Sequence, residues 1–340
     1  MYDQYVRELV QNRKLPGAVL HIAHKGKTVF QHAYGGYTDN ANHYHDMREN
    51  TVFDVASLTK VMATLPAILK LIDDDALTVK DPIQFHVPEF EHPGVTVEHA
   101  LTHATGMPAD LGKVYRDDPR DILGEVLAKS QQAEPGKGPV YSDLGMIILG
   151  HMVERITGQS LDDFTASHVF QPWGMGDTQF NPSPAIKDQT AATEMVEDRF
   201  IHGEVHDEKA YHLGGISGHA GLFSTAEDVA RFGHYWLYPN EQRVLSSGVM
   251  NRAITPYQGS RGYGFEIVTG AKGEELSCGR RWSAGSYGHT GFTGTSLWVD
   301  PKEQLVVVFL SNIVHFGRKH DMGRIRPHLH ALIHSSFTHS

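Results

Sequence analysis

The chain has 340 residues, with 30 Lys plus Arg against 40 Asp plus Glu and a formal charge of -10. This length is too great for a miniature held by disulfides or metal ions, and such a chain buries roughly three quarters of the surface that its unfolded form exposes. The acidic balance without clustered Lys and Arg excludes a general nucleic-acid binder, and the single cysteine, Cys278, cannot form an internal disulfide.

The first elements in chain order are a helix and a hairpin. An amphipathic pattern over the opening residues predicts the helix. Residues 17–34 form two apolar and β-branched runs around the turn His24-Lys25-Gly26-Lys27, which is typical of a β-hairpin. From Ser57, apolar residues recur at helical spacing until the run Asp73-Asp74-Asp75 ends the pattern. We therefore expect a sheet to begin near the N-terminus and a long helix to follow it.

Helical periodicity dominates the middle of the chain, and strand patterns return at its end. Further helices are expected at 96–103, 121–130, 144–156 and 225–237, strands at 263–268, 295–299 and 305–310, and a closing helix near 322–333. Strands at both ends with helices between them predict an α/β (α+β) fold. Its antiparallel sheet is flanked by helices, is built from both termini and carries an inserted all-helical domain.

This arrangement predicts two domains. Residues 1–50 and 210–340 form the sheet domain, residues 51–209 form the mostly helical domain, and the active site lies in the cleft between them. The N-terminus lacks the basic start, apolar stretch and cleavage site of a secretory signal. No apolar run is long enough to span a bilayer. We expect a cytoplasmic protein, unless a leader has been removed, and the sequence leaves the oligomeric state open.

The motif Ser57-Leu58-Thr59-Lys60 lies where a predicted loop becomes a helix. Three residues advance about 4.5 Å and turn about 300°, so Ser57 and Lys60 share one face of the first turn. At this helix end the macrodipole favours developing negative charge, and the Ser57 N–H is free to donate to an oxyanion. Lys60 can act as the base only if burial or another cation lowers its pKa. The alternative is that Ser57 is an ordinary helix cap.

Two further windows carry polar residues next to a predicted helix or strand. Tyr141-Ser142-Asp143 follows a loop rich in Gly and Pro and precedes the helix at 144–156. Gly288-His289-Thr290-Gly291-Phe292-Thr293-Gly294 precedes the strand at 295–299. Its glycines allow a ligand to approach the backbone closely, and a simple glycine-rich turn is the alternative.

In this order and with these separations, the three windows resemble the serine β-lactamase and penicillin-binding-protein superfamily. The similarity is strongest to its class C-like branch of carboxypeptidases, esterases and amidases. It extends from about Leu15 to about Asn312 and includes the segments 76–82, 95–106, 218–226 and 297–301. The segment Val205-His206-Asp207-Glu208 and the stretch from Thr290 to Asn312 are most similar to a subgroup that contains muropeptide amidases.

The resemblance implies a role for each motif. Ser57 would be the acylated nucleophile, and Lys60 and Tyr141 would handle protons jointly, with Lys60 either accepting the serine proton or holding Tyr141 as a phenolate. The backbone N–H groups of Ser57 and Phe292 would form an oxyanion hole, the second supplied by an edge strand that lies along the substrate. The substrate-binding and oxyanion residues expected in this way are Asp143, His289, Thr290, Gly291 and Phe292.

Two residues depart from the family pattern. The third motif usually begins with Lys, but this chain has His289, which is mostly neutral at pH 7 because the ordinary pKa of histidine is about 6.5. We therefore expect penicillins and D-Ala-D-Ala ends, which carry a carboxylate, to be poorer substrates. The second-motif position often held by Asn is Asp143, which either accepts a substrate amide N–H or pairs with Lys60.

Twenty-three histidines raise the alternative of a metal site. The best pair is His99 and His103, at the i, i+4 spacing of a helix. No H-E-x-x-H motif, Walker loop or dinucleotide fingerprint is present, and the segment 215–219 lacks the last glycine of a hydrolase nucleophile elbow. The resemblance explains the segment around His103 as structural. We therefore expect no metal and no cofactor.

The sequence predicts a serine hydrolase that forms an acyl-enzyme at Ser57. We expect its substrate to be a small molecule or muropeptide-like, with an amide bond of a peptidoglycan-derived fragment as the target. The alternatives are a short-chain carboxylesterase and a weak β-lactamase or D-Ala carboxypeptidase. A non-catalytic penicillin-binding-like protein is a further alternative, but such proteins often lose the nucleophile or base that this chain retains.

Overall fold

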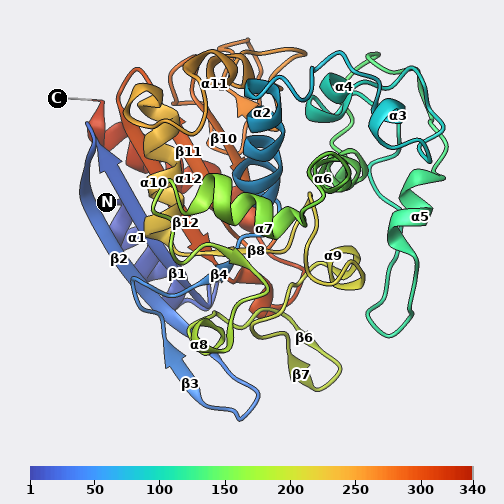
Figure 1. Ribbon diagram of the computed structural model, residues 1–340. Helices are drawn as coiled ribbons and strands as arrows, with labels where there is room; N and C mark the ends of the chain where they lie inside the picture. Colours follow the sequence, from blue (N-terminus) through green and yellow to red (C-terminus); the bar gives the residue numbers. More distant parts are fainter. Residues whose placement is uncertain (339–340) are drawn as a thin grey trace.

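The centre of the fold is an antiparallel sheet that joins the two ends of the chain. A computed structural model describes residues 1–338 (Figure 1). The sheet has seven strands in the order β3-β2-β1-β12-β11-β10-β9. Its strands are β1 Gly17–His24, β2 Lys27–Thr38, β3 Tyr44–Asp46, β9 Glu266–Ile267, β10 Tyr287–Thr290, β11 Ser296–Asp300 and β12 Leu305–Ser311. Because β1 pairs with β12, the prediction of a sheet built from both termini is confirmed.

The central strands are apolar on both faces, and this requires a covering layer on each side. Leu20 of β1 and its partner Phe309 of β12 belong to one buried cluster, whereas the neighbouring pair Val19 and Leu310 belongs to the other. Successive side chains of a strand point to opposite faces. The sheet therefore separates two cores.

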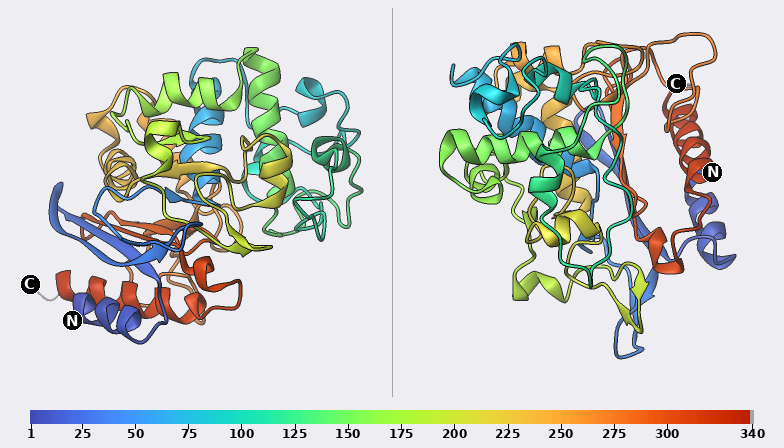
Figure 2. Two further views of the ribbon diagram at one scale, coloured as in Figure 1. Left: turned by 90° about the horizontal axis from the view of Figure 1, so that it is seen from below. Right: turned by 90° about the vertical axis from the view of Figure 1, so that its right-hand side faces the viewer.

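Helices from the two termini form one of these layers. Figure 2 shows α1 (Tyr2–Gln11) and α12 (Met322–Phe337) side by side on one face of the sheet, with the other helices on the opposite face. Val6 of α1 is fully buried beneath this layer. On the opposite face, α10 (Ala226–Leu237) packs against β1, β11 and β12. The expectation of a sheet flanked by helices is confirmed.

The segment between the two halves of the sheet is mainly helical. Its helices are η1 Lys60–Thr64 (a π-helical turn), α2 Leu65–Asp73, α3 Ile83–His86, α4 Val97–Leu101, α5 Ile122–Leu127, α6 Asp143–Thr157, α7 Leu161–Thr165, η2 Ala166–Phe170 (a second π-helical turn), α8 Pro184–Lys187 and α9 Glu208–His212. Later in the chain are η3 Pro239–Glu241, α11 Ser247–Ala253 and η4 Ile313–Phe316. The helices predicted from the apolar spacing at 96–103, 121–130 and 144–156 are all present, with slightly different ends.

The inserted segment is not purely helical, so the term all-helical was too strict. It contains the short strands β4 Phe53–Asp54, β5 Gln179–Phe180, β6 Met195–Val196 and β7 Arg199–Phe200. The later strand β8 (Leu222–Ser224) pairs with both β4 and β5. This small sheet connects segments from both predicted domains directly before Ser57.

The strand expected at 263–268 is much shorter than predicted. The N–H of Tyr263 donates to Ala253, and the N–H of Gly264 donates to Leu101 in α4. Gly264 also has φ +72, which is incompatible with an extended strand. Strand β9 is limited to Glu266 and Ile267, which pair with Tyr287 and Gly288 of β10. Beyond it, the N–H of Val268 donates to the carbonyl of Ser286.

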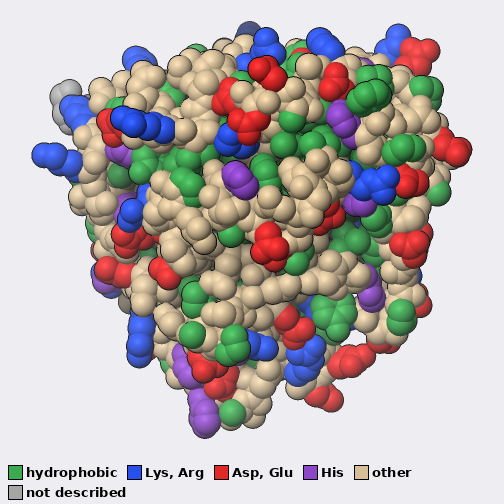
Figure 3. Space-filling model, viewed as in Figure 1, with side chains coloured by type: hydrophobic (Ala, Val, Ile, Leu, Met, Phe, Trp, Pro, Cys, Tyr) green, Lys and Arg blue, Asp and Glu red, His purple; other side chains and the backbone are tan. Residues whose placement is uncertain are grey.

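The surface carries both signs of charge. Figure 3 shows acidic, basic and histidine side chains interspersed over the face that it displays, without a single basic block on that face. Within residues 1–338, no helix combines the length and the apolar character needed to cross a membrane.

Helix α6 lies against the backbone of a later loop. Its N-terminus is capped by the Ser142 hydroxyl, which accepts a hydrogen bond from the Leu144 N–H at 3.2 Å. It ends at Gly158, whose φ of +69 suits a left-handed helix terminus. In the middle of the helix, a Cβ added to Gly150 would lie 2.9 Å from the Gly218 backbone. Glycine at this position therefore allows the loop around Gly218 to reach the helix.

We expect Gly150→Ala to lower the free energy of unfolding by about 1–3 kcal/mol, because the added methyl group overlaps the Gly218 backbone. The matched control is Gly323→Ala in α12, where a Cβ meets nothing within 4 Å. That change should raise stability by about 0.5–1 kcal/mol, since alanine favours helices. Urea unfolding at equilibrium measures both variants. A similar gain in stability for Gly150→Ala would contradict the close contact.

Candidate active site

The residues singled out in the sequence converge on one cavity of about 1100 Å³. Its lining comes from both the segment 51–209 and the segment 210–340. Lys60 has no exposed surface and does not line the cavity itself. The predicted residues that do line the cavity are Ser57, Tyr141, Asp143, His289, Thr290, Gly291 and Phe292.

A sharp turn presents Ser57 at the start of the helix. Ala56 has φ +48, in the left-handed region that is strained for a residue with a Cβ. The buried Asp54 carboxylate accepts hydrogen bonds from the Ala56 N–H at 2.8 Å and from the His206 N–H at 2.7 Å. Helical backbone begins at Leu58, so Ser57 stands at the helix N-terminus, as predicted. Asp54 stabilises this turn, and the sequence analysis did not identify it.

The glycine-rich window is bound directly to this turn. The Thr293 hydroxyl donates to the carbonyl of Asp54 at 2.7 Å, and the Thr295 hydroxyl donates to the carbonyl of Val55 at 2.9 Å. A Cβ on Gly291 would lie 2.4 Å from the Val55 carbonyl oxygen, so only glycine allows this approach. These contacts hold the backbone at 291–295 against the segment that carries Ser57.

Two backbone N–H groups are available where an oxyanion hole is expected. Neither the N–H of Ser57 nor that of Phe292 donates a hydrogen bond to another group within residues 1–338. Strand β10 is not the outermost strand of the sheet. However, β9 covers it only as far as Gly288, so the edge at His289 and Thr290 has no neighbouring strand on the β9 side. His289 and Thr290 therefore form a short free strand edge at the site, as expected from the sequence.

The groups around Lys60 favour its charged form. Its Nζ lies 2.8 Å from the Ser57 Oγ, 2.8 Å from the Asp143 Oδ1 and 3.1 Å from the His219 carbonyl oxygen. Burial disfavours its charged form, but attraction to Asp143 and Tyr141 outweighs this effect and raises the pKa of Lys60. Lys60 shares one face with Ser57 as predicted, but it is not a neutral base in the resting site.

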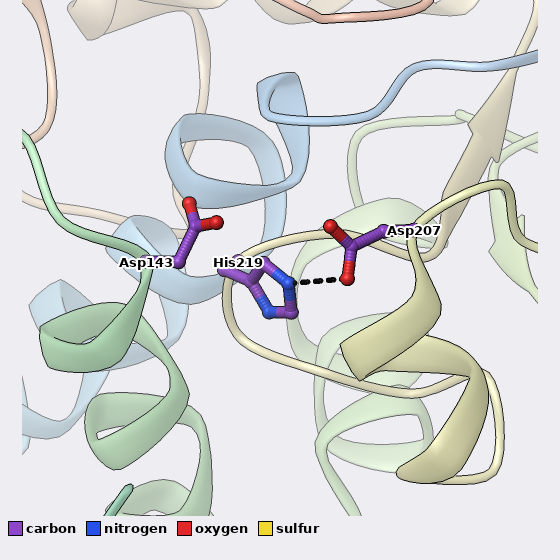
Figure 4. A group of neighbouring side chains, drawn as sticks. All are labelled: Asp143, Asp207 and His219. Atoms are coloured by element: carbon purple, nitrogen blue, oxygen red, sulfur yellow. Dashed lines mark hydrogen bonds and ion pairs between the residues drawn. The ribbon is translucent and has the colours of Figure 1, made fainter. Parts of the chain in front are cut away.

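A second buried lysine extends the ion pair. The Asp143 Oδ2 lies 3.3 Å from the Lys209 Nζ, which lies 3.4 Å from the Asp207 Oδ2. The other oxygen of Asp207 lies 2.8 Å from the His219 Nε2 (Figure 4). Burial would raise the pKa of both carboxyl groups. Attraction to Lys60, His219 and Lys209 lowers the pKa of Asp143, and contacts with His219 and Lys209 lower that of Asp207. Of the two roles considered for Asp143, the structure shows the pairing with Lys60.

Asp143, Asp207 and His219 also have the residue types of a metal site. Their ligand atoms lie within 4.8 Å of one another. Figure 4 shows the three side chains, with the Asp207–His219 contact as a dashed line. However, both oxygens of Asp143 already contact ammonium groups, from Lys60 and Lys209. A divalent cation would have to enter beside these two charges, so the donor set does not suit a metal ion.

The histidine pair at i, i+4 is not a pair on one helix. Helix α4 ends at Leu101, and His103 lies beyond it with φ +56. The Nδ1 of His99 accepts the Thr96 N–H within a capping box, and the Nδ1 of His103 accepts the Ser142 N–H at 3.2 Å. Their i, i+4 spacing therefore does not indicate a helical metal pair.

The Tyr141 ring lies among two cations and two histidines. The Lys60 Nζ is 5.1 Å and the Arg261 Cζ 5.4 Å from its centroid, and the rings of His103 and His289 are centred 4.7 and 5.8 Å away. Burial, followed by repulsion from Arg261 and Lys60, lowers the pKa of His103 to about 3. Burial and the same cations hold the pKa of His289 well below its usual value. His289 is therefore neutral at pH 7, as expected.

Two arginines that line the cavity were missed by the sequence analysis. Neither Arg261 nor Arg326 forms an ion pair within residues 1–338. They give the cavity permanent positive charge although Lys is absent from position 289. Arg261 follows α11 in an irregular loop and Arg326 lies on α12, so no local motif marks either of them. The expectation that carboxylate-bearing substrates are poorer was based on His289 and did not include the positive charges of these two arginines.

Comparisons with known proteins agree with this geometry. The family model named Beta-lactamase matches residues 2–331. The chain is 32% identical to the N-acetylmuramyl-L-alanine amidase of Bacillus subtilis (strain 168), over 88% of this chain and 78% of that protein. It is 34% identical to an Escherichia coli (strain K12) protein named "Putative D-alanyl-D-alanine carboxypeptidase", over 78% and 70%. Among solved structures, EstCE1, a hydrolase with promiscuous acyltransferase activity, is similar with a TM-score of 0.74, at 20% identity over 96% of this chain and 97% of that one.

We expect Asp143→Asn to reduce the loss of stability in acid. The lowered pKa of Asp143 contributes stability above the unfolded-state pKa of about 3.9, and this contribution is lost as the pH falls below that value. Over that range the wild-type free energy of unfolding should fall more steeply than that of the variant, by up to about 1.4 kcal/mol per pH unit. Chemical unfolding between pH 6 and pH 2 measures the difference.

The control for this experiment is Asp118→Asn, because Asp118 is exposed and forms no ion pair within residues 1–338. It should keep the wild-type slope. At pH 7, Asp143→Asn should also cost about 3–5 kcal/mol, since it leaves the buried Lys60 without its carboxylate partner. If the free energy of unfolding fell equally steeply in acid for Asp143→Asn and the wild type, the ion pairing of Asp143 would be contradicted.

Proposed function

The chain belongs to the β-lactamase family, and we propose that it is a serine hydrolase that forms an acyl-enzyme at Ser57. One observation carries the proposal. Ser57, Tyr141 and Phe292, whose N–H is free, line one cavity, and the buried Lys60 ammonium lies directly behind Ser57, 2.8 Å from its hydroxyl. A nucleophile, proton-handling groups and oxyanion donors are the parts that acyl transfer needs.

The protonation of Lys60 decides which of the two residues, Lys60 or Tyr141, accepts the Ser57 proton in the proposed mechanism. Because Lys60 is already protonated beside Asp143, we assign the acceptance of the Ser57 proton to the phenolate form of Tyr141, since a neutral phenol cannot take up a proton. The Lys60 ammonium, close to both groups, stabilises the negative charge as it passes from the Tyr141 oxygen to the Ser57 oxygen. Tyr141 is 37% exposed, so it can also reach the leaving group and water.

The reaction has two halves. In the first, the Ser57 Oγ bonds to the substrate carbonyl carbon, the C–N bond breaks and the amine leaves with the proton that Tyr141 had accepted. In the second, water gives a proton to Tyr141 and adds to the acyl carbon, the bond to Oγ breaks, and Ser57 regains its proton as the carboxylic acid departs. In both halves the carbonyl oxygen becomes an oxyanion, which the N–H groups of Ser57 and Phe292 stabilise.

For the substrate we propose an amide of a peptidoglycan-derived fragment. The Bacillus subtilis relative is named for the amide bond between N-acetylmuramic acid and L-alanine. A cavity of about 1100 Å³ has room for a sugar with attached peptide, since pockets for drug-sized ligands measure about 300–1,000 Å³. Phe292 and Tyr115 line it with exposed rings, against which the apolar face of a sugar can pack. Arg261 suits a carboxylate of the peptide.

A D-Ala carboxypeptidase is the second candidate. The Arg261 guanidinium near His289 can take the carboxylate-binding role of the missing lysine. The Escherichia coli relative, whose name includes D-alanyl-D-alanine carboxypeptidase, also supports this candidate. A short-chain esterase would use only a small part of the cavity, and this favours the larger substrates.

The acyl-enzyme is tested by covalent labelling. A fluorophosphonate should form one P–O bond to the Ser57 Oγ with loss of fluoride, and intact mass followed by peptide mapping should place the single adduct at Ser57. Ser57→Ala should form no adduct. The control Ser247→Ala, at the start of α11 outside the cavity, should label like the wild type. A folded wild-type protein that takes up no label would contradict the catalytic proposal.

The substrate is tested by rates on three compounds in parallel. We expect kcat/KM to be higher for a muramyl-peptide than for p-nitrophenyl butyrate or nitrocefin, because only the first occupies the length of the cavity. A D-Ala-D-Ala peptide included beside them tests the carboxypeptidase candidate, and Ser57→Ala gives the background rate for each. An ester rate that exceeds the muramyl-peptide rate by orders of magnitude would make the amidase proposal wrong.

A further inference from the structure

Arg326 reaches from α12 to the backbone beside Ser57. Its Nη2 donates a hydrogen bond to the carbonyl oxygen of Gly291. The same oxygen accepts the Gly294 N–H at 3.2 Å, which closes the turn. Arg326 also lines the cavity. A charged side chain from the terminal helix is thus bonded to the segment that follows β10.

The accepting carbonyl belongs to a particular peptide group. The C=O of Gly291 and the N–H of Phe292 lie on opposite sides of one planar peptide unit. A charge-assisted hydrogen bond to the C=O is stronger than a neutral one, and it polarises the unit so that its N–H becomes a better donor. Fixing the C=O also fixes the direction of the N–H, because the unit is rigid.

Within residues 1–338, no acidic side chain contacts the Arg326 guanidinium. No carboxylate forms an ion pair with Arg326 within residues 1–338, and its Nε is buried without a hydrogen-bond partner. Glu266 attracts it from a distance, while the Glu266 oxygens accept hydrogen bonds from the N–H and the hydroxyl of Ser277. Burial lowers the pKa of Arg326 to about 10, so it remains charged at neutral pH. Its positive charge therefore acts on the Gly291–Phe292 peptide without being neutralised locally.

We propose that Arg326 is a positioning residue of the oxyanion hole, which orients and polarises the Gly291–Phe292 peptide for the charge that forms on the substrate oxygen. The inference rests on the proposed function, in which the Phe292 N–H is an oxyanion donor. Arg326 acts through this peptide and helps the transition state more than the bound substrate. It is therefore distinct from Arg261, which contacts the Tyr141 ring and no part of that peptide.

The test compares Arg326→Met with Arg324→Met. Arg324 is exposed on the same helix and forms no side-chain hydrogen bond or ion pair within residues 1–338, so it controls for loss of one positive charge from α12. Three quantities are measured for each protein: kcat and KM on the preferred substrate, the affinity for phenylboronic acid, and the thermal unfolding midpoint. The boronic acid bonds to the Ser57 Oγ to form a tetrahedral adduct, with one boron-bound oxygen in the oxyanion hole.

We expect Arg326→Met to lower kcat and the affinity for phenylboronic acid in parallel, by about 10- to 100-fold, which is less than the effect of deleting an oxyanion donor outright. KM should change little, and Arg324→Met should match the wild type. Arg326→Lys should recover part of both losses, because an ammonium can donate to the same carbonyl. If Arg326→Met does not fold, Arg326→Lys and Arg326→Gln replace it, with the larger loss of boronic acid affinity expected for the neutral glutamine.

Two results would overturn the inference. One is an unchanged affinity for phenylboronic acid in a folded Arg326 variant. The other is a rise in KM at constant kcat, which would show that Arg326 binds an anionic group of the substrate instead. A wild-type protein that forms neither the boronate nor the fluorophosphonate adduct would contradict the proposed function itself, so the two failures are distinguishable.

Discussion

The ammonium group of Lys60 has no exposed surface, and removing a charge from water is costly unless other groups compensate it. The surrounding elements provide this compensation. Asp143 comes from the first turn of α6, the His219 carbonyl comes from the loop before β8, and the Ser57 hydroxyl comes from the preceding helical turn. Three separate parts of the chain therefore have to meet at one nitrogen atom. On the other side of Asp143 lies Lys209, which also contacts Asp207, so the partly buried Asp143 carboxylate stands between two lysines.

A second set of contacts connects the nucleophile to the sheet. The turn before Ser57 is held by the Asp54 carboxylate on one side and by the hydroxyls of Thr293 and Thr295 on the other. The loop between β10 and β11 is thus joined to the turn before Ser57 through backbone carbonyl groups, which do not depend on the protonation of any side chain. In the proposed mechanism, this connection would hold the N–H groups of Ser57 and Phe292 at a fixed separation.

The positive charges around the cavity are of two kinds, those paired with a carboxylate and those that are not. Near Ser57 the positive charge of Lys60 is balanced by Asp143, so its main effect is local. Arg261 and Arg326 have no such partner within residues 1–338, and their charge remains available to a substrate or to the backbone. Burial and repulsion from Lys60 and Arg261 keep His289 neutral, so the positive charge near this position comes from neighbouring side chains and not from His289 itself.

The amino-acid sequence alone was enough to predict the sheet built from both termini, most of the helices, and the candidate site residues that belong to local motifs. Ser57 and Lys60 are three residues apart, so helical geometry places them on one face, and the strand patterns at both ends of the chain predict a sheet that joins the termini. The direction of the Lys60 pKa shift could not be read from the sequence, because it depends on Asp143 and Tyr141, which are more than eighty positions away in the chain. Arg261 and Arg326 were missed for the same reason, since each acts through a contact with a distant segment and has no local partner that would form a motif. Lys209 contacts the nearby Asp207, but its contacts with Asp110 and Asp143 join segments that only the folded chain brings together.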